Sequence, residues 1–270
     1  MSKRPVLFLD SGVGGLPYYE WVMHRVYDRS LVYVADTEHF PYGDKPVETI
    51  LSLAEELAVR IIESFDPALI VLSCNTLSVI ALSMLRSRFP VPMVGVVPAV
   101  KPAAARSEKK RIGVIATKRT IEDVYLKQLI AEFASDCSVH PFADNGLVGF
   151  VETRILEADE EEKNNACAAS VSYFKEAGID ALVLGCTHFI FLKNTFAGLL
   201  GGGVKVLDSV EGVGRQVLRL LIGDDHTGAE PGGRSAGLFV TSAEKGPFYR
   251  SLSSRFGIEY GGLLTSGVRL

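Results

Sequence analysis

Cys74 and Cys186 are the residues of this 270-residue chain whose type and surroundings best suit chemistry. Each follows four apolar residues and one small residue, and each precedes hydrogen-bonding side chains, Asn75-Thr76 in the first case and Thr187-His188 in the second. A free thiol has a pKa of about 8.5, so a modest shift gives a useful fraction of thiolate at neutral pH. Two equivalent thiols suggest a two-base reaction, in which one removes a proton and the other supplies one from the opposite side of a carbon centre.

The apolar runs predict the elements that position these thiols. Leu69–Leu72 and Ala181–Leu184 are short and bounded by turn residues, which is typical of buried parallel strands. Each cysteine therefore falls at the C-terminal end of a strand, where parallel α/β sheets bind their ligands. Opening strands over residues 5–9 and Arg111–Ala116 precede them at comparable spacing, so we interpret the chain as a duplicated α/β unit.

Polar groups near the predicted strand ends are candidates to assist the thiols. Asp10 and His188 each stand beside a proposed reacting centre, where they could tune a thiol or relay a proton. The glycine-rich turn over residues 10–15 suits an anion, but it lacks the Lys-Ser/Thr of a P-loop and the G-x-G-x-x-G spacing, which argues against a nucleotide. From the residues alone, Asp10 could equally cap the following helix, and Glu152 could equally be surface charge.

Periodicity and turn chemistry predict the remaining elements. Residues 145–150 are predicted to form a loop, as is the Gly-, Asp- and Pro-rich stretch over residues 223–234. Further strands are expected over residues 31–35, 93–97, 137–142, 204–207 and 238–241. Helices are expected over residues 17–27, 47–65, 120–134, 209–222 and 245–256, and one more helix is expected to follow Cys74 and to end at about residue 88.

Composition narrows the class of protein. A hydrophobic content of 47% supports substantial cores, either in one large α/β domain or in two of ordinary size. A net charge of −4 with scattered basic residues argues against nucleic acid as the main partner. We find neither a membrane-length apolar run nor a secretory signal, and expect a cytoplasmic protein. The four cysteines show no disulfide framework or zinc spacing, and Cys137 and Cys167 are expected to be structural.

At these motifs the chain resembles glutamate racemase, of the cofactor-independent aspartate/glutamate racemase superfamily. The matching pieces occur in the family's order from residue 6 to about residue 222, and residues 239–256 resemble the family's C-terminal tail. They are Asp10-Ser-Gly-Val-Gly-Gly15-Leu16, Ala35-Asp36-Thr37, Pro41-Tyr42-Gly43, Cys74-Asn75-Thr76, Ala116-Thr117 with Thr120, Val151-Glu152 and Gly185-Cys186-Thr187-His188.

The resemblance implies an α/β fold of two similar domains. Both would have mainly parallel sheets, be related by a pseudo-twofold axis and face each other across a central cleft. Residues 1–97 and 209–270 would form the first domain, with Cys74, and residues 98–208 the second, with Cys186.

The resemblance also implies an amino-acid racemase, an isomerase that needs neither PLP nor a metal. It would interconvert L- and D-glutamate and supply D-glutamate for peptidoglycan, and we expect a homodimer that binds neither nucleic acid nor membrane. By position, Cys74 and Cys186 would transfer the protons, assisted by Asp10, Glu152 and His188. The implied glutamate-holding residues are Asp10, Ser11, Pro41, Tyr42, Gly43, Asn75, Thr76, Thr117, Thr120, Thr187 and His188.

Two motifs depart from the family pattern. Residues 189–191 are Phe-Ile-Phe where the family usually has Tyr-Pro-Leu, and residues 97–99 are Val-Pro-Ala where it often has Glu-Pro-Gly. Neither departure falls on a proposed reacting atom, but both lie near the expected cleft or hinge. The resemblance therefore predicts the type of reaction more directly than it predicts the substrate. Alternatives are a racemase of aspartate or another acid, a binding role such as the DNA gyrase binding of some glutamate racemases, and a redox pair of Cys74 with Cys186.

Overall fold

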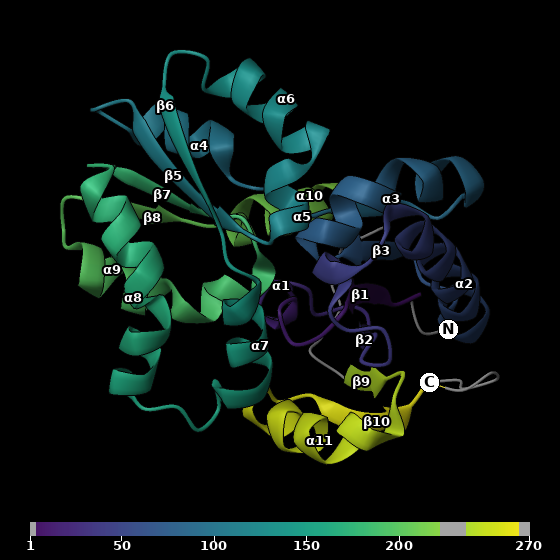
Figure 1. Ribbon diagram of the computed structural model, residues 1–270. Helices are drawn as coiled ribbons and strands as arrows, with labels where there is room; N and C mark the ends of the chain where they lie inside the picture. The colour runs from purple at the N-terminus through teal and green to yellow at the C-terminus, as the bar shows by residue number, and fades with distance from the viewer. Residues whose placement is uncertain (1–3, 222–235, 265–270) are drawn as a thin grey trace. The chain divides into compact units, whose positions relative to one another are not determined.

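A computed structural model describes residues 4–221 and 236–264 of the chain (Figure 1). The chain divides into two compact units, the first made of Met1–Val96 and Val210–Leu270 and the second of Val97–Ser209. Each unit contains one sheet of parallel strands with helices around it, which confirms the predicted α/β class. The loop predicted over residues 223–234 lies outside the described residues.

The first unit contains a six-stranded sheet in the order β10-β9-β2-β1-β3-β4. Every residue of β1, β2 and β3 is buried, as expected for strands covered on both faces. The strands are β1 (Val6–Asp10), β2 (Leu31–Ala35), β3 (Leu69–Leu72), β4 (Met93–Gly95), β9 (Ala236–Val240) and β10 (Glu259–Leu263). The helices are α1 (Leu16–Met23), η1 (Tyr42–Asp44), α2 (Val47–Phe65), α3 (Asn75–Arg88), α10 (Val210–Leu221), η3 (Ala243–Lys245) and α11 (Gly246–Arg255).

The second unit contains a four-stranded sheet in the order β6-β5-β7-β8. Its strands are β5 (Arg111–Ala116), β6 (Ser138–Ala143), β7 (Ala181–Leu184) and β8 (Lys205–Leu207). Its helices are α4 (Val100–Arg106), α5 (Lys118–Glu122), α6 (Val124–Phe133), α7 (Asn145–Arg154), α8 (Glu160–Glu176), η2 (Thr187–Leu192) and α9 (Lys193–Leu200).

The two sheets share one topology. The order β2-β1-β3-β4 in the first unit corresponds strand for strand to β6-β5-β7-β8 in the second. Pairing also corresponds, because Leu9 lies opposite Leu72 between β1 and β3, and Ile115 lies opposite Leu184 between β5 and β7. The structure therefore supports a duplicated α/β unit, to which the first unit adds β9 and β10.

Two sequence predictions of secondary structure were wrong, and two elements, α4 and β10, were not predicted. Residues 145–150 are not a loop but begin α7, because the Asp144 carboxylate accepts a hydrogen bond from Leu147 N at 2.9 Å and caps the helix. The helix predicted over residues 120–134 is interrupted at Asp123, which caps α6. β10 was missed, because Gly261 and Gly262 have low strand propensity.

Helix α10 packs against α1 through a glycine. A Cβ atom at Gly214 would overlap the Trp21 ring. The Arg25 guanidinium lies over the same ring, 3.9 Å from its centroid, and its Nη1 donates to the Trp21 carbonyl. The ring is therefore held in place where α10 approaches it.

We predict that Gly214→Ala lowers the free energy of unfolding by about 1–3 kcal/mol, because the added methyl group overpacks against Trp21. Gly212 is the matched control in the same helix, since a Cβ there meets nothing within 4 Å. Gly212→Ala should raise the free energy of unfolding by about 0.5–1 kcal/mol through helix propensity. Urea unfolding followed by circular dichroism measures both, and equal effects would contradict the packing argument.

Candidate functional site

In the first unit, Cys74 lies at the C-terminal end of a central strand. β3 ends at Leu72, and Ser73 N donates to the Leu9 carbonyl at 2.8 Å, which extends the pairing with β1 by one residue. Cys74 follows as the N-cap of α3, with an extended backbone and a buried side chain. Cys74 is thereby placed beside the end of β1, where Asp10 stands.

Cys186 occupies the equivalent place in the second unit. Gly185 N donates to the Ile115 carbonyl at 2.7 Å, and Cys186 is the buried N-cap of η2. Its φ and ψ of −132° and 138° are close to the −126° and 124° of Cys74. Both are free thiols. The fold thus presents one thiol at the same point of each unit.

A buried chain of polar groups leads away from Cys186. His188 Nδ1 lies 4.0 Å from Cys186 Sγ, and His188 Nε2 lies 3.0 Å from Glu152 Oε2. Since a carboxylate only accepts, it favours the tautomer with the proton on Nε2 and leaves Nδ1 as an acceptor facing the thiol. Glu152 comes from α7 and is buried, so its reading as surface charge does not hold. This arrangement can take a proton from Cys186 and return it.

Asp10 belongs to a turn rather than to a helix cap. Its Oδ1 accepts from Gly12 N at 2.9 Å, whereas the N-cap of α1 is Gly15, with no side-chain cap bond. The Tyr33 hydroxyl donates to the Gly12 carbonyl at 2.7 Å and accepts from Gly15 N at 3.1 Å. The turn therefore holds a buried carboxylate at the end of β1.

The other predicted site residues lie in the two units separately, all at the carboxyl ends of strands or at the starts of the helices that follow. In the second unit, the Thr117 hydroxyl caps α5 by accepting from Thr120 N at 3.3 Å and donates to Thr120 Oγ1 at 3.1 Å. Thr187 is buried in η2. The first unit holds Ser11, Pro41, Tyr42, Gly43, Asn75 and Thr76.

Comparison with known proteins identifies the family. Residues 26–215 match the family model described as Asp/Glu/Hydantoin racemase. The chain belongs to this family. It is 41% identical over 260 residues to the glutamate racemase of Treponema pallidum, covering 95% of each chain, and 38% identical to that of Shewanella sp. strain MR-7, covering 81% of this chain and 80% of the relative.

Solved structures of the family agree. The Escherichia coli glutamate racemase in complex with L-glutamate and the activator UDP-MurNAc-ala has a TM-score of 0.84 and 29% identity, with 99% of this chain and 98% of the other covered. The glutamate racemase of Aquifex pyrophilus has a TM-score of 0.74 and 30% identity, with 96% and 98% covered. The predicted resemblance to glutamate racemase and the prediction of an amino-acid racemase are confirmed.

In this racemase Tyr42 has a partner that sequence reasoning did not assign to the site. Its buried hydroxyl donates to Asp36 Oδ2. Burial raises the pKa of Tyr42 well above its ordinary value, and the Asp36 carboxylate adds to this by its charge and its hydrogen bond, with smaller contributions from Cys74 and Asp10. Tyr42 therefore keeps its proton. The signal for Asp36 was its place directly after β2, at the edge of the sheet that also carries Asp10.

The two remaining cysteines show no comparable surroundings. Burial raises the pKa of the Cys167 thiol to about 12, and Cys137 has a raised pKa from burial and from neighbouring Asp136. Neither is a favourable source of thiolate, which agrees with the expectation that both are structural. Within residues 4–221 and 236–264 no group of three or more His, Cys, Asp or Glu side chains could hold a metal. No helix in this part of the chain has the length and apolarity to cross a bilayer.

The raised pKa of Tyr42 predicts a loss of stability in alkali. Below the unfolded-state pKa of about 10 its contribution is fully present. As the pH rises above that value the unfolded chain releases the proton first, so the free energy of unfolding falls until the pH passes the folded-state pKa. Tyr42→Phe should therefore show a smaller fall between about pH 9 and pH 11, measured by urea unfolding. Tyr27→Phe, at an exposed tyrosine, is the control and should follow the wild type.

Proposed function

We propose that this racemase interconverts L- and D-glutamate without a cofactor, with Cys74 and Cys186 as its two bases. The relatives it matches over most of their length are glutamate racemases, and the E. coli structure contains L-glutamate. The observation that carries the two-base proposal is that the two units present a thiol at the same backbone position. By family membership, D-glutamate would serve peptidoglycan synthesis.

In the proposed reaction one thiolate removes the proton from the α-carbon of glutamate and becomes a thiol. The thiol of the other cysteine delivers its proton to the opposite face of the same carbon and becomes a thiolate. The C–H bond is broken on one face and formed on the other, so the carbon is inverted with no net change in electrons. The reverse direction exchanges the roles of Cys74 and Cys186, and proton exchange with solvent resets the pair.

The surroundings of each thiol suit different tasks. His188 can accept the Cys186 proton at Nδ1 while Glu152 stabilises the imidazolium that forms. On the Cys74 side, we propose that the Asp10 carboxylate meets the substrate ammonium. The hydroxyls and amide of Ser11, Asn75, Thr76, Thr117, Thr120 and Thr187 are proposed to hold the two carboxylates of glutamate.

Tyr42 is proposed to act through its backbone rather than its hydroxyl. A phenol has one proton to donate, and that of Tyr42 goes to Asp36. It is therefore not available to a glutamate carboxylate. In the segment Pro41–Gly43, Tyr42 and Gly43 would instead offer their backbone N–H groups, and the position of the segment would depend on the bond between Tyr42 and Asp36.

The two-thiol mechanism predicts that Cys74→Ser and Cys186→Ser each lower the racemisation rate by about 10²–10⁴-fold, because serine is a far weaker acid than cysteine. Circular dichroism decay of enantiopure glutamate measures the rate, and NMR in deuterium oxide measures exchange at the α-carbon. Cys137→Ser is the control and should keep wild-type activity. Full exchange in both site variants would exclude the mechanism, and wild-type activity on aspartate but not on glutamate would favour the alternative substrate.

Glu152→Gln tests the relay at Cys186. The new amide can donate to His188 Nε2, which would place the histidine proton on Nδ1 and remove the acceptor that faces the thiol. We expect kcat to fall by about 10–100-fold, measured with both enantiomers. The control Glu161→Gln lies on the exposed surface of α8 and should leave kcat unchanged. A normal kcat in Glu152→Gln would show that the relay is not used.

A homodimer and a cytoplasmic location also remain proposals. Sedimentation velocity of the purified protein at micromolar concentration tests the dimer, and a single species of monomer mass would rule it out.

A further inference from the structure

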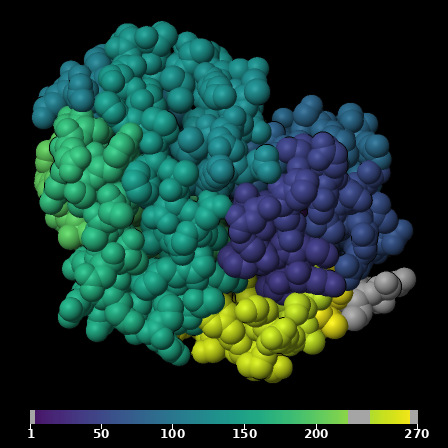
Figure 2. Space-filling view, in the orientation of Figure 1, coloured from purple at the N-terminus to yellow at the C-terminus, as the bar shows by residue number. Residues whose placement is uncertain are grey.

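The C-terminal segment is joined to the loop after β2 by hydrogen bonds from residues 241 and 242. β9 pairs with β2 from Leu31 opposite Ala236 to Ala35 opposite Val240, and Thr241 N continues the pairing to the Ala35 carbonyl at 3.1 Å. Ser242 N then donates to Thr37 Oγ1 at 3.0 Å. In the space-filling view, the yellow C-terminal segment lies directly against the purple N-terminal part of the same unit (Figure 2).

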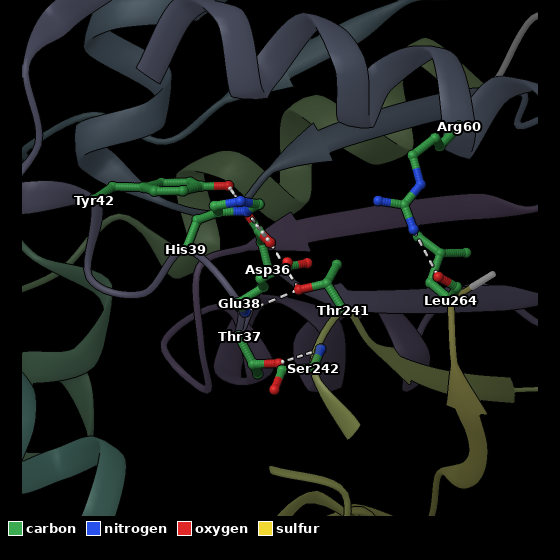
Figure 3. A network of polar contacts seen from close by, with 9 residues as sticks. All are labelled: Asp36, Thr37, Glu38, His39, Tyr42, Arg60, Thr241, Ser242 and Leu264. Carbon is green, nitrogen blue, oxygen red and sulfur yellow. Dashed lines mark hydrogen bonds and ion pairs between the residues drawn. The ribbon is translucent and has the colours of Figure 1, made fainter. Parts of the chain in front are cut away.

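The Thr241 hydroxyl uses both its donor and its acceptor on this loop. It donates to Asp36 Oδ1 at 2.7 Å and accepts from Glu38 N at 3.0 Å (Figure 3). Thr241 and Asp36 are both buried. A valine would keep the shape of the side chain and lose both hydrogen bonds.

Asp36 connects this hydroxyl to the proposed site. Its carboxylate also accepts from the Tyr42 hydroxyl and lies 3.0 Å from His39 Nδ1 (Figure 3). Its backbone N–H donates to the Asp10 carbonyl at 2.8 Å. A buried carboxylate that loses a donor keeps an unsatisfied oxygen, which favours a shift towards its remaining donors. Because Tyr42 is bonded to that carboxylate, such a shift would carry Tyr42 and its segment with it.

We propose that Thr241 is a positioning residue for the reaction. Through Asp36 it fixes Tyr42 and the adjoining Pro41–Gly43 segment in the conformation that binds the amino-acid substrate. The inference rests on the proposed function, since it assigns that segment to glutamate. It makes the C-terminal segment, far away in the sequence, part of what determines substrate affinity.

Thr241→Val is the test variant. We expect KM for glutamate to rise by about tenfold, as the loss of one buried charge-assisted hydrogen bond predicts, with kcat within about twofold of the wild type. Thr241→Ser keeps the hydroxyl and should restore KM. Thr241→Cys, a weaker donor, should give an intermediate KM and serves in place of valine if the valine variant does not fold.

Arg60→Met is the matched control. Arg60 Nη2 donates to the Leu264 carbonyl at 2.7 Å, so this variant weakens the attachment of the same C-terminal segment without touching Asp36 (Figure 3). Its stability in urea should fall while KM stays at the wild-type value. In a Tyr42→Phe background, Thr241→Val should change KM by less than about twofold, because the bond that transmits its effect is already absent.

The outcomes separate this inference from the proposed function. A wild-type protein that does not racemise glutamate contradicts the proposed function. An active wild type with an unchanged KM in Thr241→Val contradicts the positioning role alone. An equal rise of KM in Arg60→Met and Thr241→Val would show that Thr241 serves only to attach the C-terminal segment, which also overturns the proposal.

Discussion

The position of each candidate thiol depends on one backbone hydrogen bond that occurs in both units. Ser73 N donates to the Leu9 carbonyl and Gly185 N to the Ile115 carbonyl, each one residue before the cysteine. A shift of one residue in this pairing would turn the thiol to the other face of the sheet. The residue that donates this bond differs between the units. The Ser73 hydroxyl also donates to the Leu9 carbonyl at 3.1 Å. At Gly185 there is little room for a side chain, because a Cβ would lie 3.1 Å from the Ile115 oxygen and 3.0 Å from Ala116 Cβ.

Sequence patterns predicted the elements that carry the thiols, because a buried parallel strand is a short apolar run whose ends are marked by the turn residues next to it in the sequence. The run Leu69–Leu72 and helix α2 agree with the structure to the residue. Elements with weak local signals were missed, such as β10, whose strand pairing outweighs its two glycines. The bond between Asp36 and Thr241 could not be predicted, because it joins residues 205 positions apart and exists only once β9 pairs with β2.

The added strands explain why two similar sheets differ in burial. In the first unit β9 covers the edge of β2, and every β2 residue is buried. Its counterpart β6 is the edge strand of the second sheet, has exposed and half-buried residues, and contains Pro141, which an edge strand tolerates. The C-terminal segment thus turns an edge into an interior strand, and the buried surroundings it creates allow Asp36 to hold Tyr42.

An aspartate follows β2 in the first unit and another follows the equivalent strand β6 in the second, and the two carboxylates make different hydrogen bonds. Asp36 N donates to the Asp10 carbonyl at 2.8 Å and Asp144 N to the Ala116 carbonyl at 2.9 Å, so their backbones are equivalent. The Asp144 carboxylate caps α7, the helix that carries Glu152, whereas Asp36 accepts from Tyr42 and Thr241. The repeated backbone fixes where the polar groups stand, and the side chains decide what they do. Under the proposed mechanism the α-carbon bears different groups, so the two proposed bases would need such different surroundings.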